Sequence, residues 1–220
     1  MSNPPILKVE NLRKVFGGRG GLLKKADEKV AVNDVSFEVR EGETLALVGE
    51  SGSGKSTVGL MALGLLSVTS GKVLFDGRSV TDLNSQDRLA LRRKIQVVFQ
   101  DPYGSLNGRM TVRETLTEGM VIHKLGANTA EREERAKSLL LSVGMLPEAL
   151  DRYPHEFSGG MRQRVVIAIA MANDPDVILA DEPTTALDVT VQAEILRLLR
   201  ELVDERHSHC AARGARDHVH

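Results

Sequence analysis

One stretch of the sequence combines the residue types that bind a polyphosphate. It reads Leu45-Ala-Leu-Val-Gly-Glu-Ser-Gly-Ser-Gly-Lys-Ser-Thr57, a buried-strand pattern followed by a glycine-rich turn, a lysine and two hydroxyl residues. The glycines let the backbone turn its N–H groups inward, and a helix that begins at Lys55 adds the positive end of its dipole. A chance glycine-rich turn is the weaker alternative, because the full spacing lies between an apolar run and a helical pattern. The stretch therefore predicts a phosphate-binding loop.

Each polar side chain of this loop has an expected role. Lys55 supplies a mobile charge for the β- and γ-phosphates, and the Ser56 hydroxyl ligates the Mg²⁺ that accompanies a nucleotide. Thr57 supports the α- and β-phosphates. The residues expected to contact the nucleotide here are Gly49, Glu50, Ser51, Gly52, Ser53, Gly54, Lys55, Ser56 and Thr57.

Two other strand patterns end in residues that would complete a nucleotide site. Val177-Ile-Leu-Ala-Asp-Glu182 is an apolar run closed by two carboxylates. Asp181 is expected to hold Mg²⁺ through water and Glu182 to polarise the water that attacks the γ-phosphate, although an exposed acidic turn is the alternative. The buried pattern Ile95-Gln-Val-Val-Phe99 delivers Gln100 at its carboxyl end, where α/β sheets gather their ligand groups.

A second anion site is predicted at Phe157-Ser-Gly-Gly-Met-Arg-Gln-Arg164, just before an apolar helix. A serine N-cap followed by two glycines leaves helix N–H groups bare, which favours an anion. One nucleotide needs only one such site on a chain. Two chains packed head to tail would let the bare helix end of each close over the γ-phosphate held by the other.

Composition limits the class of protein. The 220 residues are 41% hydrophobic, enough for one sizeable α/β core with an inserted subdomain. The net charge of −1 gives no overall field that would recruit nucleic acid or an anionic membrane. A single cysteine, Cys210, and a start without a signal-peptide layout predict a cytoplasmic chain. The longest apolar run, Val165 to Ala172, is shorter than the roughly 20 residues that a membrane helix needs.

The remaining periodicities predict the elements around these motifs. Strand patterns over 6–10 and 30–40, the latter as two short runs around Asn33-Asp34, indicate an antiparallel lead-in, and 71–77 is a strand closed by an Asp-Gly turn. An exposed loop is expected at 17–25, and Phe16 beside it is either an aromatic platform for a base or a core residue. Helices are predicted at 85–93, 111–123, 129–143 and from 158 onward, which makes 111–172 an inserted helical subdomain.

Together these motifs resemble the ATP-binding cassette (ABC) family, from about Leu7 to about Glu201. The resemblance implies a P-loop NTPase core with a mostly parallel sheet, and a role for Gln100 in both catalysis and Mg²⁺ contact. It identifies the loop as Walker A, Gln100 as the Q-loop, Ser158, Gly159, Gly160 and Met161 as the signature, Asp181-Glu182 as Walker B and Ala186-Leu-Asp188 as the D-loop. The stretches 100–107, 152–157 and 181–192 look like the oligopeptide and dipeptide importer branch. In that family a membrane permease contacts the helical subdomain and the Q-loop.

The sequence departs from the family pattern in places. Met161 replaces the usual signature glutamine and cannot hydrogen-bond a ribose, and Gly104 and Gly108 stand where the branch often has Ala and Pro. The family's γ-phosphate histidine would fall at about Ala215, after an apolar strand that this chain lacks. We therefore expect the last strands of the family fold to be missing and residues 207–220 to form an atypical, truncated or frame-shifted tail. That tail is solvated or, as the weaker alternative, binds a metal through its histidines and Cys210.

These observations predict an ABC-type nucleotide-binding domain over 1–206 that binds ATP and Mg²⁺. The expected protein is the ATP-hydrolysing subunit of a peptide importer, peripheral on the cytoplasmic face of the membrane. Its expected partners are transmembrane permease subunits and a second ATP-binding subunit, identical or different, with no nucleic acid. The alternatives are a soluble ATPase of the same family and a nucleotide-binding fragment with little hydrolysis.

Overall fold

The computed structural model describes residues 4–17, 28–99, 101–181 and 189–214. The chain divides into two compact units, Met1–Arg92 and Arg93–His220. The first unit contains the phosphate-loop sequence. The second unit contains the helical region and the strand that ends at the Asp181-Glu182 carboxylates.

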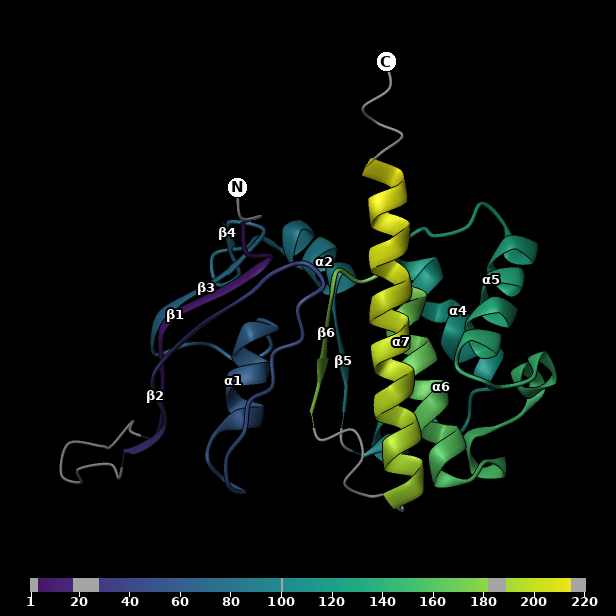
Figure 1. The fold of residues 1–220 in the computed structure, drawn as a ribbon, viewed down its shortest axis with the longest axis horizontal. Coiled ribbons are helices and arrows are strands. Elements are labelled where there is room, and N and C mark those ends of the chain that lie inside the picture. Colours follow the sequence, from purple (N-terminus) through teal and green to yellow (C-terminus); the bar gives the residue numbers. More distant parts are fainter. Residues whose placement is uncertain (1–3, 18–27, 100, 182–188, 215–220) are drawn as a thin grey trace. The chain divides into compact units, whose positions relative to one another are not determined.

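The first unit is built on a four-stranded antiparallel sheet (Figure 1), which confirms the predicted lead-in. Its strands are β1 (Leu7–Phe16), β2 (Lys29–Val39), β3 (Ser70–Phe75) and β4 (Arg78–Ser79), in the order β2-β1-β3-β4. A strand points successive side chains to opposite faces, so Leu7 and Val9 are both buried, and a register shift between Val9 and Leu12 brings Leu12 to the buried face as well.

The region 30–40 forms one strand rather than the two short runs predicted. Asp34 takes a positive φ of 56°, and β1 has its own irregularity at Asn11, whose φ is 48°. Aspartate and asparagine tolerate this conformation, so the ladder continues through the distortion. The Asn11 Nδ2 donates to Asp34 Oδ1 at 2.9 Å and fixes the two irregular positions against each other.

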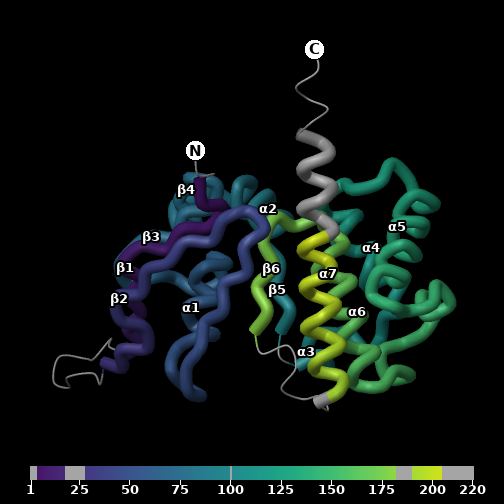
Figure 2. Tube along the Cα trace, viewed as in Figure 1, coloured from purple at the N-terminus to yellow at the C-terminus, as the bar shows by residue number. Residues whose placement is uncertain are grey.

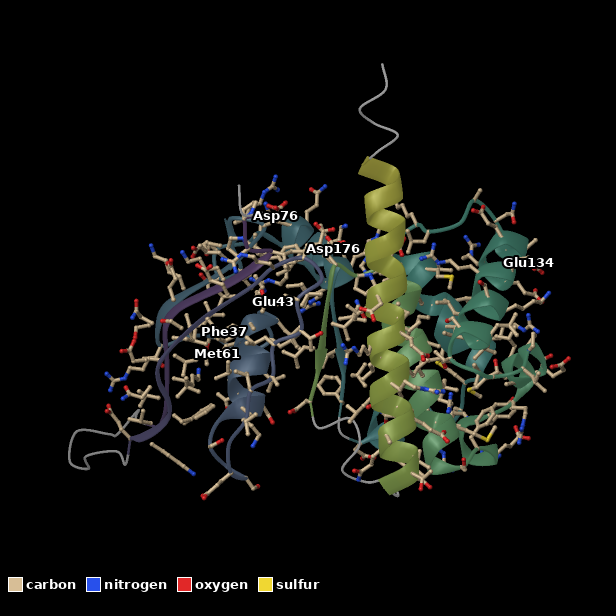
Figure 3. The ribbon with its side chains drawn as sticks, in the orientation of Figure 1. Phe37, Glu43, Met61, Asp76, Glu134 and Asp176 are labelled. Carbon is tan, nitrogen blue, oxygen red and sulfur yellow. The ribbon has the colours of Figure 1, made fainter. Side chains whose placement is uncertain are left out.

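Two helices accompany this sheet. Helix α1 (Lys55–Ala62) follows the glycine-rich loop, and Met61 on α1 is fully buried (Figure 3). Helix α2 (Ser85–Lys94) crosses the boundary between the units. The Asn84 side chain accepts a hydrogen bond from the Asp87 amide at 2.9 Å, so Asn84 is the N-cap of α2.

The prediction of a buried strand at 45–48 was wrong. No strand is assigned there, and Leu45, Leu47 and Val48 are exposed, Val48 to 93%. An apolar run becomes a buried strand only when neighbouring strands pair with its backbone and cover its side chains. In the described part of the chain no strand pairs with residues 45–48.

The second unit contains a parallel strand pair and a helical bundle (Figure 2). Strands β5 (Ile95–Val98) and β6 (Val177–Ala180) pair in parallel, with Val98 opposite Ala180. The ion pair between Lys94 and Asp176, at 2.9 Å, lies just before both strands. The helices are α3 (Pro102–Ser105), α4 (Val112–Ile122), α5 (Thr129–Ser142), the 3₁₀ turns η1 (Pro147–Asp151) and η2 (Pro154–Glu156), α6 (Gly159–Ala172) and α7 (Val189–Gly214).

Helix α6 is the centre of the core of this unit. Its residues Val165, Ile167 and Ala168 are fully buried, and the helix contacts α3, α4, α5, α7 and β5. The helices predicted at 111–123, 129–143 and 158 onward therefore form, each within one or two residues of its expected ends. Their N-caps are Thr111, Asn128 and Ser158, polar side chains that accept hydrogen bonds from the first turn.

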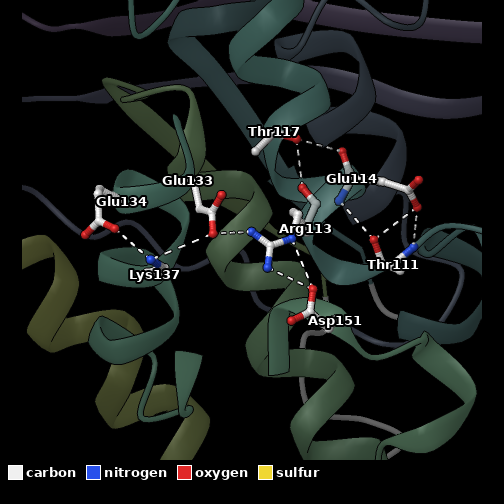
Figure 4. A network of polar contacts seen from close by, with 8 residues as sticks. All are labelled: Thr111, Arg113, Glu114, Thr117, Glu133, Glu134, Lys137 and Asp151. Carbon is white, nitrogen blue, oxygen red and sulfur yellow. Dashed lines mark hydrogen bonds and ion pairs between the residues drawn. The ribbon is translucent and has the colours of Figure 1, made fainter. Parts of the chain in front are cut away.

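A polar network ties α4 to α5 and η1 on the outside of the bundle (Figure 4). Arg113 on α4 donates to Asp151 at 2.8 Å and pairs with Glu133 on α5 at 2.6 Å. These hydrogen bonds, to Asp151 first and then Glu133, raise the pKa of Arg113. The network extends along α5 through Lys137, whose pKa is raised mainly by its hydrogen bond to Glu134. A shared, multiply bonded arginine fixes the helix positions better than isolated surface pairs do.

Helix α7 was not predicted. It begins at Val189 and runs to Gly214, so its backbone continues into the region expected to be an atypical tail. Ile195, Leu198 and Leu202 are buried on one side of it, at the spacing that lets a helix cover a core. Residues 215–220 lie outside the described residues.

Two glycines predict opposite responses to alanine. At Gly71 the φ is 91°, and an added Cβ would lie 2.3 Å from the Asn11 carbonyl oxygen, so Gly71→Ala should lower the free energy of unfolding by at least about 1–3 kcal/mol. Gly108 has open space around it and no positive φ, so Gly108→Ala should raise that free energy by about 0.4–1 kcal/mol through the unfolded chain. Urea unfolding of both variants checks the pair, and equal effects would contradict the assignment.

Candidate functional site

The glycine-rich loop is fixed to the first unit at its carboxyl end. Gly54 has a φ of 97°, and a Cβ there would lie 2.4 Å from the Ala31 carbonyl oxygen of β2. Only glycine permits both the left-handed backbone and this approach. Gly52 also has a positive φ, of 80°, with open space around it. The loop therefore turns sharply where it enters α1, whose first N–H groups are the kind that bind a phosphate.

The lysine of the loop is held by the loop's own backbone. Its Nζ donates to the carbonyl oxygens of Gly49 and Glu50, at 2.8 and 2.9 Å. The amide of Ser53 donates to the same Glu50 oxygen at 3.2 Å, which closes the turn. These contacts place the ammonium group over the loop, where the predicted phosphate contacts require it.

An open pocket of about 420 Å³ lies beside this loop, entirely within the first unit. The loop contributes Gly49, Ser53, Gly54 and Lys55 to one wall. The other wall is apolar and comes from β2 and from residues 47 and 48, with Val30 and Val32 among its members. The arrangement combines a polar cradle with an apolar surface, as nucleotide sites do.

Phe16 is not a core residue, one of the two roles left open for it. It ends β1 with 41% of its surface exposed, and the Lys14 ammonium lies 5.1 Å from the ring centroid. The Lys14 Nζ also donates to the Ser67 carbonyl oxygen at 2.6 Å, so it is held on one side of the ring. The exposed part of Phe16, at the end of β1, remains available for the base platform that was predicted.

In the second unit, the parallel pairing of β5 and β6 places one predicted site residue, Asp181, beside the carboxyl end of β5. The Asp181 amide donates to the Val98 carbonyl oxygen at 2.9 Å, which extends the parallel ladder by one residue. Asp181 is partly buried and has further interactions. Gln100, two residues after Val98, lies outside the described residues, as do Glu182 and the predicted D-loop at 186–188.

The predicted second anion site forms the first turn of α6. The Ser158 Oγ accepts from the Met161 amide at 3.4 Å, a long and therefore weak N-cap bond. Gly160 is required by packing, because a Cβ there would lie 2.8 Å from a methyl carbon of Val191 on α7. Ser158 is exposed, and Gly159, Gly160 and Met161 are partly buried. The turn is accessible from outside this unit's core, and its hydroxyl is only lightly engaged.

Two residues next to the predicted motifs were missed by sequence reasoning. Tyr103, on α3, stacks over the guanidinium of Arg162, on α6, with 3.8 Å between the Arg162 Cζ and the ring centroid. Tyr103 lies in the stretch 100–107, which resembles the importer branch, and Arg162 directly follows the signature residues. Their sequence separation of about 60 residues left no local signal that they meet.

Residues 32–185 match the sequence profile of the family described as "ABC transporter". The chain belongs to this family. The match covers more than half of the chain and includes the glycine-rich loop, α6 and β6. It confirms the P-loop NTPase α/β fold expected from the motifs.

Curated relatives place the chain near the peptide-transport ABC proteins. It is 48% identical to the oligopeptide transport ATP-binding protein OppF of Bacillus subtilis, over 91% of this chain and 64% of the relative. It is 46% identical to a putative peptide import ATP-binding protein of Brucella ovis, over 92% of this chain and 62% of the relative. The chain thus spans less than two thirds of the length of these relatives.

Solved ABC structures share the fold. The dimeric, post-hydrolysis ATP-binding cassette MJ0796, bound to ADP and Pi, aligns with a TM-score of 0.77 and 32% identity over 91% of this chain and 84% of that one. CbiO1 of Clostridium perfringens, part of the transporter complex cbiONQ, aligns with a TM-score of 0.77 and 31% identity, over 92% and 75%. Among the described residues of this ABC chain, no helix is both long and apolar enough to cross a bilayer.

The contacts of Lys55 predict the effect of removing it. Lys55→Ala should abolish binding of a fluorescent ATP analogue, because the phosphate charge would then meet only N–H dipoles. Lys72→Ala is the matched control, since Lys72 is an exposed lysine on β3 of the same unit and should bind like the wild type. Unchanged affinity in Lys55→Ala, measured by fluorescence titration, would contradict the site.

Proposed function

We propose that this chain is the ATP-binding and ATP-hydrolysing subunit of an ABC importer for oligopeptides or dipeptides. The observation that carries the proposal is the loop at 49–57, in which glycine geometry and the backbone-held Lys55 form a cradle beside an open pocket. The names of the curated relatives, an oligopeptide transport ATP-binding protein and a peptide import ATP-binding protein, support the class of cargo.

In the first unit the loop binds the nucleotide. The N–H groups of the loop and the start of α1 hold the phosphates. Lys55 neutralises the β- and γ-phosphates, and Thr57 supports the α- and β-phosphates from the helix. Phe16 stacks on the base through its exposed face. The Ser56 hydroxyl would be a ligand of the Mg²⁺ that accompanies the nucleotide. The pocket fits a polyphosphate because its polar wall is backbone and lysine rather than carboxylate.

In the second unit the carboxyl edge of β5 and β6 supplies the hydrolytic groups. Asp181 and Gln100 help to hold Mg²⁺, which offsets charge on the phosphates when it is bound. Glu182 accepts a proton from the attacking water as general base. In the sequence Glu182 directly follows Asp181, whose amide donates to the Val98 carbonyl oxygen at the carboxyl end of β5.

The first turn of α6 serves a nucleotide held by a second ATP-binding subunit. Ser158 offers a hydroxyl with only a weak intrahelical bond, and the glycines at 159 and 160 leave backbone N–H groups accessible. Met161 contributes packing, not a hydrogen bond to ribose. Membrane permease subunits are the other partners, and the chain acts as a peripheral protein on the cytoplasmic face of the membrane.

Assembly through this turn gives a test. With Glu182→Gln to block hydrolysis and Mg²⁺-ATP present, the chain should form dimers, alone or with a paralogue, by light scattering. Adding Ser158→Arg should prevent them, because a long side chain fills the anion site. Ser142→Arg, which adds the same charge at an exposed serine of α5, should not. Dimers that persist in the Ser158→Arg variant would count against the proposal.

Transport is tested in the host cell. Deleting the gene should stop uptake of a labelled oligopeptide, and a plasmid copy of the full-length gene should restore it. The same plasmid carrying Lys55→Ala should not restore uptake, because capture of ATP is lost. Normal uptake in the deletion strain would rule out a non-redundant role in peptide import.

A further inference from the structure

The helix after the Q-loop position is a rigid, single turn. Asp101 caps α3 by accepting a hydrogen bond from the Tyr103 amide at 2.9 Å, and Pro102 is buried. The Ser105 hydroxyl donates back to the Asp101 carbonyl oxygen at 2.7 Å, and Leu106 then enters the core. The backbone of Tyr103 is therefore held within α3, and 66% of the Tyr103 surface is exposed.

Beneath that ring lies a buried positive charge. Arg162 is buried, its Nε donates to the Pro154 carbonyl oxygen at 2.7 Å, and its Cζ lies 3.8 Å from the Tyr103 ring centroid. One of its terminal nitrogens, Nη1, is buried and has no hydrogen-bond partner among the described residues. The electron-rich face of Tyr103 therefore stabilises the buried guanidinium together with the Pro154 carbonyl oxygen.

Arg162 is also part of the turn that contains the signature. It directly follows Met161, and its amide donates to the Ser158 carbonyl oxygen at 3.0 Å, the first hydrogen bond of α6. The Pro154 carbonyl oxygen that receives its side chain belongs to η2, four residues before Ser158. The guanidinium therefore joins three segments: η2, α3 and the first turn of α6. The weak N-cap bond of Ser158 leaves that turn dependent on such outside support.

We propose that the stack of Tyr103 on Arg162 is a positioning contact that holds Ser158 to Met161 in the geometry needed at the partner subunit's nucleotide. The inference rests on the proposed function of that turn and adds the residue pair that controls it. Displacing the ring leaves the buried charge with its hydrogen bond to Pro154 alone, and the guanidinium moves with the turn that carries it. The placement of α3 is in this way coupled to the N–H groups at the start of α6.

The test separates the ring from its hydroxyl. Tyr103→Leu removes the aromatic face but keeps an apolar side chain at an exposed position, and Tyr103→Phe keeps the face. In the full chain with Mg²⁺-ATP, Tyr103→Leu should lower kcat about 5- to 30-fold, the range between loss of an exposed and loss of a desolvated cation–π contact. The affinity for a fluorescent ATP analogue should not change, since that ligand binds at 49–57. Tyr103→Phe should retain nearly the wild-type kcat.

A second measurement does not require turnover. Amide hydrogen exchange of a peptide covering 157–163 should be faster in Tyr103→Leu than in the wild type and unchanged in Tyr103→Phe. An unchanged kcat and exchange in Tyr103→Leu, or equal losses in both variants, would overturn the positioning role. If the wild-type chain binds and hydrolyses no ATP, the proposed function fails, while the exchange comparison still decides whether the stack holds the turn.

Discussion

The approach of Gly54 to the Ala31 carbonyl oxygen is the constraint on which the nucleotide cradle depends. A loop that binds phosphate through its backbone must keep N–H groups uncovered and must still be held in place. Here the antiparallel sheet supplies the anchor, because β2 touches the loop at a position where no side chain fits. The backbone oxygens that hold Lys55 then belong to a loop of fixed shape. The antiparallel lead-in strands are thus part of the candidate phosphate site.

The two helix starts expected to bind phosphate are built in different ways. Helix α1 begins after a left-handed glycine with no side-chain cap, whereas α6 begins at a serine whose cap bond is long. The start of α1 is stabilised by contacts within the first unit, and it suits a ligand that stays bound through a catalytic cycle. The start of α6 has only a weak cap bond for its backbone N–H groups, and η2 and α3 support it through Arg162. This difference matches a turn that meets its ligand only when a second subunit arrives.

Local patterns predicted the features that depend on neighbouring residues in the chain. The N-cap at Ser158 and the periodicity of α4, α5 and α6 are encoded in short windows of the sequence, and these helices form close to their expected ends. The predicted strand at 45–48 does not form. Its apolar residues indicate that the segment needs neighbouring strands, but they do not specify which strands would pair with it. The contact between Tyr103 and Arg162 was not predicted for the same reason, since no local sequence pattern around either residue indicates that the two side chains meet. Helix α7 was missed because its polar composition past 203 hid the apolar stripe of Ile195, Leu198 and Leu202.

The exposed run from Thr44 to Val48 also has a consequence for the behaviour of the protein in solution. It contains no charge and no proline, and its main chain lies outside any sheet of the described structure. Segments of this kind are templates for intermolecular strand pairing. The segment ends directly at the phosphate loop, where gatekeeper charges would disturb nucleotide capture. Self-association of this chain should therefore begin at the edge of its own ligand site, and nucleotide, by ordering the adjoining loop, should slow it.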